Sequence, residues 1–282
     1  MNVDEIAAQH GFTDEDMPDL LGMMATQAFQ NYVEDQNIFY LGKAIIFGRE
    51  ALSRGGEEDP SYASWLSNLS VFLVAQFDET RKITDLHEAI QFIRQAFELT
   101  PSEDPDRNDY LTNLGVMLEK SYEETGDMQT LNEAIENSRQ LILADQPDET
   151  AAYLNNLANQ LGRRYDNLGE IKDLEEAISL ARRVVELTEA EDSNLASYLN
   201  NLGDKLLRLY NHTEEMHHLE ETIQVVRQSA YLGGEDEYGR QKEAFDHLKG
   251  LLKTKYKRTG VMKDLGEAIL GAIPTTNGLH FS

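Results

Sequence analysis

Three residues recur along the chain at fixed intervals, and this repetition limits the possible folds more than any other feature. An aromatic residue follows each leucine of one set by 8 residues, and an isoleucine follows each aromatic by 13. Successive leucines are 43 to 46 residues apart, so length varies only between an isoleucine and the next leucine. A fixed period in this range is typical of solenoids, whose repeats pack against their neighbours. The leucines are Leu69, Leu114, Leu157, Leu202 and Leu248, the aromatics Phe77, Tyr122, Tyr165, Tyr210 and Tyr256, the isoleucines Ile90, Ile135, Ile178, Ile223 and Ile269, and an upstream copy has Met24, Tyr32 and Ile45.

Each half of the repeat has the pattern of an amphipathic helix. Between Leu111 and Tyr122, apolar residues are spaced by 3, 4 and 4 residues, which places them on one face of a helix. A similar face runs from Leu174 to Val185 in the other half of a repeat. Small alanines on the second helices allow a neighbouring helix to approach closely; they are Ala89, Ala134, Ala177 and Ala268.

These helix pairs predict the fold class and its extent. A two-helix unit cannot bury its apolar face alone, so neighbouring units must stack. We expect an all-α protein, a right-handed α-solenoid of antiparallel helix pairs with a concave inner surface. Residues 18–273 should hold about six pairs, the last truncated, between an N-terminal cap or flexible segment at 1–17 and a flexible C-terminal tail at 274–282.

The helix ends are marked by glycines and by acidic residues. Gly126, Gly169 and Gly260 each follow the aromatic residue by four positions, where a left-handed residue would close the first helix. Asp or Thr then precedes Glu by three residues, which is the capping-box pattern for the start of the second helix. The predicted boxes are Asp85–Glu88, Thr130–Glu133, Asp173–Glu176 and Asp264–Glu267.

The chain is strongly acidic, with 51 Asp and Glu against 25 Lys and Arg and a formal net charge of −26. This balance argues against DNA or RNA as a partner, because phosphate binding needs a basic surface, and it disfavours anionic membranes. The chain has no cysteine, which excludes disulfides, thiolate catalysis and Cys-based zinc sites. No stretch resembles a secretory signal or reaches the roughly 18 apolar residues of a membrane span. We therefore expect a cytoplasmic protein.

Five segments resemble the tetratricopeptide repeat family, three of them its first-helix core and two the core and end of its second helix: Tyr110–Gly115, Tyr153–Ala158, Tyr198–Gly203, Asp173–Ile178 and Glu98–Pro101. The repeats are longer than the usual ~34 residues. They are similar to those of fungal multidomain signalling proteins with caspase-like (CHAT) peptidase or nucleotide-binding domains. The chain has neither a cysteine nor a Gly-x-x-x-x-Gly-Lys-Ser/Thr loop, so neither companion domain is visible in it. The resemblance implies a protein-binding scaffold.

Asparagine stands just before four of the equivalent leucines. It is a mediocre helix former, so its recurrence inside helices needs a reason. Its amide offers a donor and an acceptor, as an extended peptide backbone requires. The family resemblance implies a ladder of such asparagines that holds a bound peptide, and packing between neighbouring helices is the alternative. The candidate residues are Asn68, Asn113, Asn156 and Asn201.

A row of basic residues follows the asparagines. Lys120, Arg163 and Arg208 lie seven residues after three of them. Seven residues turn a helix by ~700°, so each base falls within ~20° of its asparagine. The row can bind carboxylates of a ligand, since arginine's forked donors suit such groups. The alternative is that these residues only pair with acids in adjacent helices.

No catalytic, cofactor or metal site is expected from the sequence. His212, His217 and His218 cluster between two helices, but without His-Glu-x-x-His spacing an exposed polar loop is the prediction. Carboxylates are so frequent that no pair can be singled out as a catalytic dyad.

The prediction for function is a non-enzymatic scaffold that binds a peptide or protein segment in the concave groove. A regulatory, sensor or oligomerisation segment of a larger fungal signalling protein is the alternative, and an enzyme on a helical scaffold is a third. The last repeat meets Gly271 and Pro274 soon after Ile269, so its second helix should be short. Self-association through this C-terminal end is one way to cover the preceding repeat.

Overall fold

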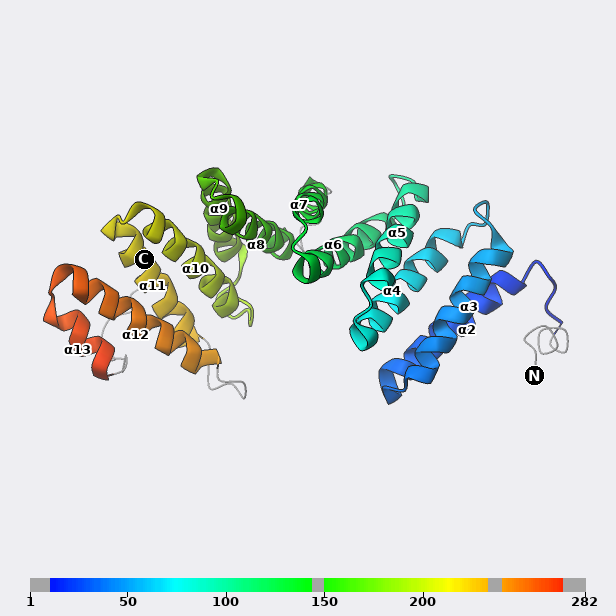
Figure 1. The fold of residues 1–282 in the computed structure, drawn as a ribbon, viewed down its shortest axis with the longest axis horizontal. Coiled ribbons are helices and arrows are strands. Elements are labelled where there is room, and N and C mark those ends of the chain that lie inside the picture. The colour runs from blue at the N-terminus through cyan, green and yellow to red at the C-terminus, as the bar shows by residue number, and fades with distance from the viewer. Residues whose placement is uncertain (1–10, 144–149, 233–239, 271–282) are drawn as a thin grey trace. The chain divides into compact units, whose positions relative to one another are not determined.

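A computed structural model describes residues 11–143, 150–232 and 240–270, and all regular secondary structure in these ranges is helical. Twelve helices, α2 to α13, lie in the described ranges, and no strand does (Figure 1). This confirms the all-α prediction. The predicted C-terminal tail at 274–282, with Gly271 and Pro274, lies outside the described residues, as do residues 1–10 of the predicted N-terminal segment.

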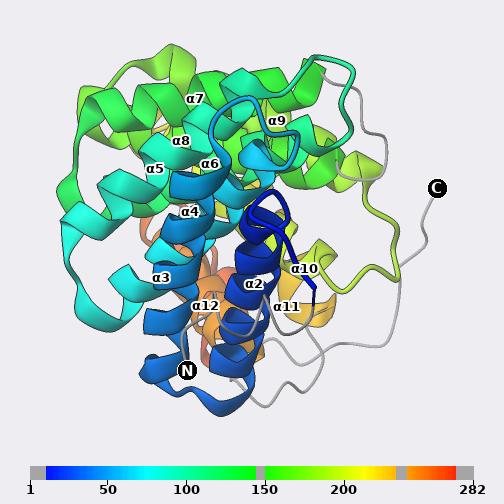
Figure 2. The ribbon, with the colours of Figure 1, turned by 90° about the vertical axis from the view of Figure 1, so that its right-hand side faces the viewer.

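The chain divides into two compact units, Met1–Ala144 and Asp145–Ser282. In the N-terminal unit each helix packs against the next, and Figure 2 shows α2, α3 and α4 beside one another. In the C-terminal unit α8 to α13 pack in the same serial manner. The helices of the first unit are α2 Met17–Asp35, α3 Ile38–Gly55, α4 Tyr62–Thr80, α5 Ile83–Leu99, α6 Asp106–Thr125 and α7 Met128–Leu143. Those of the second are α8 Thr150–Leu168, α9 Ile171–Leu187, α10 Leu195–Thr213, α11 Met216–Leu232, α12 Arg240–Thr259 and α13 Met262–Leu270.

A two-residue elbow joins the helices of every pair and explains the constant interval of 13 residues. The first elbow residue has a positive φ, between 52° and 72°, and its backbone N–H donates to the carbonyl of the repeat's aromatic residue at 2.7 to 2.8 Å. This left-handed closure confirms the prediction for Gly126, Gly169 and Gly260. The other three elbows place Gln36, Arg81 and Glu214 in the same conformation, which the sequence did not indicate.

The predicted capping boxes are wrong for the pairs whose caps the structure defines. Helix α5 begins at Ile83 after Lys82, so Asp85 lies inside its first turn, where it accepts a 2.9 Å hydrogen bond from Gln76 Nε2. Asp173 lies inside α9 in the same way and forms two hydrogen bonds with Arg164, of 2.7 and 2.8 Å. The short elbow starts the second helix about one turn earlier than the pattern suggested.

The glutamates of three supposed boxes, and Glu221 at the equivalent position of the fifth copy, instead connect neighbouring second helices. Glu88 of α5 pairs with Arg49 of α3 at 2.6 Å, and Glu133 of α7 pairs with Arg94 of α5 at 2.6 Å. In the C-terminal unit Glu221 and Glu267 pair with the preceding second helix in the same manner. Those pairs are Arg182–Glu221 at 2.7 Å and Arg227–Glu267 at 2.5 Å.

The repeat positions supply the core of both units. All five equivalent leucines are buried, and so are the alanines predicted to allow close packing. The isoleucines are buried in the first five copies, whereas Ile269 of α13 is 69% exposed. The last described pair therefore exposes to solvent an isoleucine that is buried in every preceding pair.

Candidate functional site

The predicted asparagine row lies on the first helices of the pairs, which are the even-numbered helices α2 to α12. Asn68 of α4 and Asn156 of α8 are exposed, and Asn113 of α6 is half-buried. None of these three side chains has a hydrogen-bond partner within the described part of the chain. Their amides are therefore available to a ligand.

Asn201 differs from the other members of the row. Its Nδ2 on α10 donates a 3.0 Å hydrogen bond to Oδ1 of Asn155 on α8. For this residue the structure supports the packing alternative, in which the asparagine links neighbouring first helices.

The basic row is engaged by acids of the preceding first helix. Nζ of Lys120 on α6 lies 2.5 Å from Oδ1 of Asp78 on α4. Nη2 of Arg208 on α10 lies 3.0 Å from Oδ2 of Asp166 on α8. Arg163 is half-buried on α8. Ion pairing is thus observed for Lys120 and Arg208. Because these pairs are partly exposed, a ligand carboxylate can compete for the cations.

Lys205 is a polar group that the sequence reasoning missed. Only 2% of this α10 residue is exposed, and its Nζ donates to Oδ1 of Asn159 at 2.7 Å and to the carbonyl of Asn201 at 3.3 Å. Burial lowers the pKa of Lys205 to about 8, with a further contribution from the charge of Arg208. The signal was a lysine at a core position, since the equivalent residues are Phe72, Met117, Gln160 and Leu251.

Asn68 borders an open hollow of about 380 Å³ between α2 and α4. Trp65 and Gly22 also line this hollow. A Cβ at Gly22 would lie 2.6 Å from Nε1 of Trp65, so only glycine lets the indole pack this close to α2. The hollow places one asparagine of the row next to a concave surface of the N-terminal unit.

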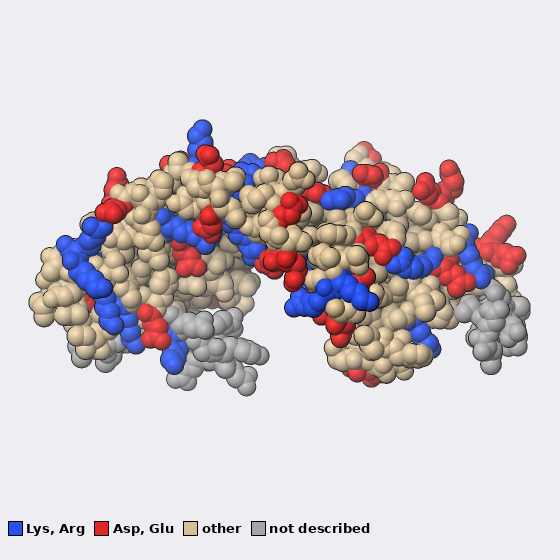
Figure 3. Space-filling model, viewed as in Figure 1, with Lys and Arg blue, Asp and Glu red and all other residues tan. Residues whose placement is uncertain are grey.

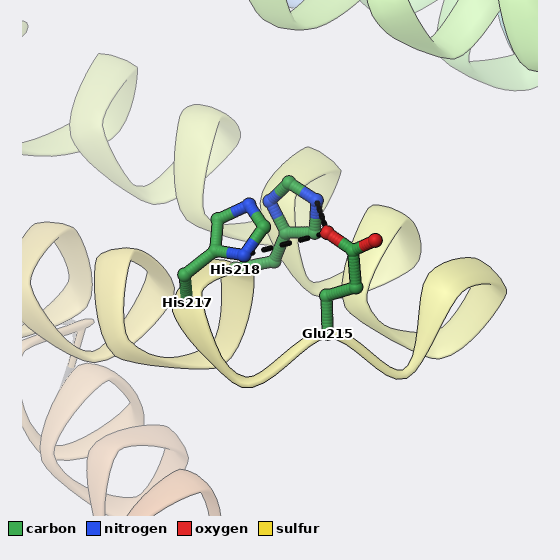
Figure 4. A group of neighbouring side chains, drawn as sticks. All are labelled: Glu215, His217 and His218. Carbon is green, nitrogen blue, oxygen red and sulfur yellow. Dashed lines mark ion pairs between the residues drawn. The ribbon is translucent and has the colours of Figure 1, made fainter.

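The elbow between α10 and α11 brings two of the three clustered histidines together. The rings of His217 and His218 lie 3.8 Å apart, and both approach Oε2 of Glu215 (Figure 4). Burial, followed by the neighbouring His217, lowers the pKa of His218. His212 is held elsewhere, with its Nδ1 3.2 Å from the hydroxyl of Tyr165. The prediction of an exposed polar loop is wrong, because His212 lies in α10 and His217 and His218 lie in the first turn of α11. His212 and His217 are nevertheless exposed, whereas His218 is half-buried and its Nδ1 is buried.

Charges of both signs are interspersed on the described surface. On the face seen in Figure 3, Lys and Arg lie among Asp and Glu without forming one broad basic patch. Among the described helices, none combines the length and apolar character needed to cross a membrane.

Comparisons with known proteins agree with the helical repeat. Residues 150–192, which include α8 and α9, match the family model described as tetratricopeptide repeat. No curated protein matches the chain. Solved structures with the same type of fold include YrrB, described as a TPR protein with an unusual peptide-binding site. It has 15% identity and a TM-score of 0.54 over 86% of this chain and 97% of that one.

Two further structures are similar. The TPR-like repeats of a putative kinesin light chain from Podosopora anserina have 17% identity and a TM-score of 0.53 over 76% of this chain and 96% of that one. BtubC from P. vanneervenii has 15% identity and a TM-score of 0.51 over 96% of both chains. At such low identity these matches establish the fold, a solenoid of tetratricopeptide type. The relation to fungal signalling proteins stays a prediction.

Proposed function

We propose that this tetratricopeptide-type solenoid is a non-enzymatic scaffold that binds an extended peptide or protein segment along its first helices. The observation that carries the proposal is the row of equivalent asparagines. Asn68, Asn113 and Asn156 recur at one position of the repeat, and none has a hydrogen-bond partner among the described residues. Each offers a peptide group both a donor and an acceptor.

The basic row supports a ligand with acidic groups. Lys120 and Arg208 lie on the same helices as Asn113 and Asn201, two turns further along. A ligand carboxylate that replaces Asp78 or Asp166 as their partner would exchange one ion pair for another. Such an exchange costs little, because exposed pairs are individually weak. The site residues proposed are thus the four asparagines with Lys120, Arg163 and Arg208.

The class of partner follows from charge and fold. A protein or peptide is proposed, with neither nucleic acid nor membrane, because the net charge is −26. YrrB, which has the same type of fold, is described as having an unusual peptide-binding site, and this supports peptide recognition by such solenoids. The same proposal includes a cytoplasmic location and no enzymatic activity.

A displayed library of random dodecapeptides tests the proposal. Enriched peptides are synthesised, and their affinity for the full chain is measured by fluorescence polarisation. The double variant Asn68→Ala/Asn113→Ala, with both changes in the N-terminal unit, should weaken binding about 30-fold, since each lost hydrogen bond contributes about 1 kcal/mol. Asn211→Ala, an exposed asparagine near the end of α10, is the matched control and should bind as the unaltered chain does. Equal affinity of the double variant and the control would show that the asparagines do not bind the ligand.

A second candidate function, assembly through the C-terminal pair, is favoured by a different observation. Ile269 and Met262 of α13 are 69% and 66% exposed, although isoleucine at the position of Ile269 is buried in the other copies. Size-exclusion chromatography with light scattering tests self-association, and Ile269→Asp should shift any oligomer to monomer. A monomer at all concentrations would exclude this function.

A further inference from the structure

Two imidazoles and one carboxylate converge on the elbow between α10 and α11 (Figure 4). Oε2 of Glu215 lies 3.4 Å from Nδ1 of His217 and 3.6 Å from Nε2 of His218. One ligand atom from each of the three residues can be chosen so that all lie within 4.8 Å of one another. Among the described residues this is the group of three His, Asp or Glu side chains close enough to hold a metal ion together.

These separations are long for hydrogen bonds and suit metal ligands. An N–H···O bond has its heavy atoms about 2.7–3.2 Å apart, so neither imidazole is closely bonded to the carboxylate. In a tetrahedral zinc site, ligand bonds of about 2.0–2.1 Å place neighbouring ligand atoms about 3.3–3.4 Å apart. Both carboxylate–imidazole separations are within about 0.3 Å of that value.

We propose that Glu215, His217 and His218 form a binding site for a divalent first-row transition ion such as Zn²⁺. His217 would coordinate through Nδ1, His218 through Nε2 and Glu215 through its carboxylate. Nε2 is the available nitrogen of His218, because its Nδ1 is buried and has no partner in the described structure. The side chains of His217 and Glu215 are 64% and 58% exposed, so solvent has access to the remaining coordination position.

The choice of metal follows from the ligand atoms. Imidazole nitrogens favour zinc, copper and nickel, whereas magnesium and calcium prefer sites built from oxygen. The chain has no cysteine to compete as a soft ligand, and its net charge of −26 attracts cations. Because Nδ1 of His218 has no partner to orient the ring, we expect affinity about 10- to 100-fold below that of a fully supported site.

Isothermal titration of the full, tag-free chain with ZnCl₂ tests the proposal. One ion should bind at pH 7.4 with a dissociation constant on the order of 10 µM, and MgCl₂ should give no binding at this site. At pH 5.5 the affinity should fall at least tenfold, because protons compete for the imidazoles. In NMR spectra the imidazole resonances of His217 and His218 should shift on zinc addition, while those of His87 should not.

Matched variants separate this site from other histidines. His217→Ala/His218→Gln should weaken zinc binding at least 30-fold, whereas His212→Ala, which removes a histidine of the same elbow region, should bind normally. Circular dichroism spectra show whether each variant is folded, and Glu215→Gln provides a milder change that retains both imidazoles. Unchanged zinc affinity in the folded double variant, or no binding by the unaltered chain at 1 mM ZnCl₂, would overturn the proposal.

Discussion

The first helices of neighbouring pairs meet through different chemistry in the two units. In the N-terminal unit, Phe72 of α4 packs on Phe29 of α2 with ring centroids 4.8 Å apart. In the C-terminal unit, the equivalent position on α10 is Lys205, whose ammonium group is hydrogen-bonded to Asn159 of α8. One repeat position thus holds an aromatic contact in one unit and a buried polar contact in the other.

The same difference changes the role of the asparagine row. Asn201 reaches Asn155 on the preceding first helix, 46 residues earlier in the chain. The residue 46 positions before Asn113 is Ser67, whose shorter side chain cannot make this bond. Asn113 therefore keeps its amide free of partners among the described residues, while Asn201 uses its amide in packing. The comparison teaches that residues at one repeat position can differ in role, because the bonding of each depends on what the preceding first helix presents: Asn201 packs against Asn155, whereas Asn113 has no partner among the described residues.

The largest expected effect is in the aromatic contact. Phe72→Ala should destabilise the N-terminal unit by about 3–5 kcal/mol, because removing the buried phenyl ring leaves a cavity in the core. Urea unfolding followed by NMR resonances of each unit measures this loss. The exposed Phe39 of α3 is the control, and Phe39→Ala should change stability by less than about 0.5 kcal/mol. A similar loss of unfolding free energy in both variants would contradict a stabilising contact between Phe72 and Phe29.

The buried amine gives the next largest effect. Lys205→Met should stabilise the C-terminal unit by about 2 kcal/mol at pH 7, since the pKa shift corresponds to about 3 kcal/mol and lost hydrogen bonds offset part of it. The pKa is lowered from 10.5 to about 8, so the cost of burying the charge is full below pH 8. It disappears as pH rises toward 10.5, and the advantage of the variant should disappear with it.

Urea unfolding at several pH values between 7 and 10.5 measures this trend. The exposed Lys253 of α12 offers a matched control, and Lys253→Met should show no such pH dependence. If the stability gained by Lys205→Met stays constant with pH, burial of the charged ammonium group is not what destabilises the unaltered chain.

A smaller effect distinguishes the two kinds of asparagine. Asn201→Ala should cost about 1 kcal/mol, because it removes a hydrogen bond and leaves the amide oxygen of Asn155 without its donor. Asn113→Ala removes no bond between described residues and should leave stability nearly unchanged. Thermal unfolding of the two variants measures the contrast, and equal losses would remove the distinction between Asn201 and Asn113.

The smallest effect concerns the elbows. Gln36 has a φ of 52°, a conformation that glycine adopts without strain. Gln36→Gly should stabilise the first pair by about 0.5–1 kcal/mol, whereas Gly126→Ala should destabilise the third by a similar amount. Thermal unfolding checks both signs, and a loss for Gln36→Gly would show that its side chain contributes more than the backbone strain costs.

Much of the fold could be predicted because the repeat uses local signals. The helix faces follow from spacing alone, and the glycine elbows from a single residue type. The capping boxes failed because the same Asp-x-x-Glu pattern also serves contacts between repeats. Glu88 pairs with Arg49, 39 residues earlier, and no local window shows such a partner. The elbows at Arg81 and Glu214 could not be predicted either, since helix packing imposes a conformation that these residues disfavour.

The sequence predicted which residues of the candidate site lie on the first helices, but not the hydrogen bonds that their side chains make. The recurrence of asparagine located Asn68, Asn113 and Asn156 on the first helices, yet the partner of Asn201 depends on which residue the preceding helix presents. The convergence of Glu215 with two histidines depends on the geometry of one elbow. Spacing in the sequence carries neither kind of information.

The two-residue elbows have a consequence for how the chain folds during its synthesis. Because each hairpin closes through contacts near in sequence, it loses little loop entropy and should form quickly. A hairpin can be completed once its second helix has left the ribosome, before any later repeat exists. Growth of the structure would then proceed in steps of 43 to 46 residues, each new pair docking onto a finished neighbour.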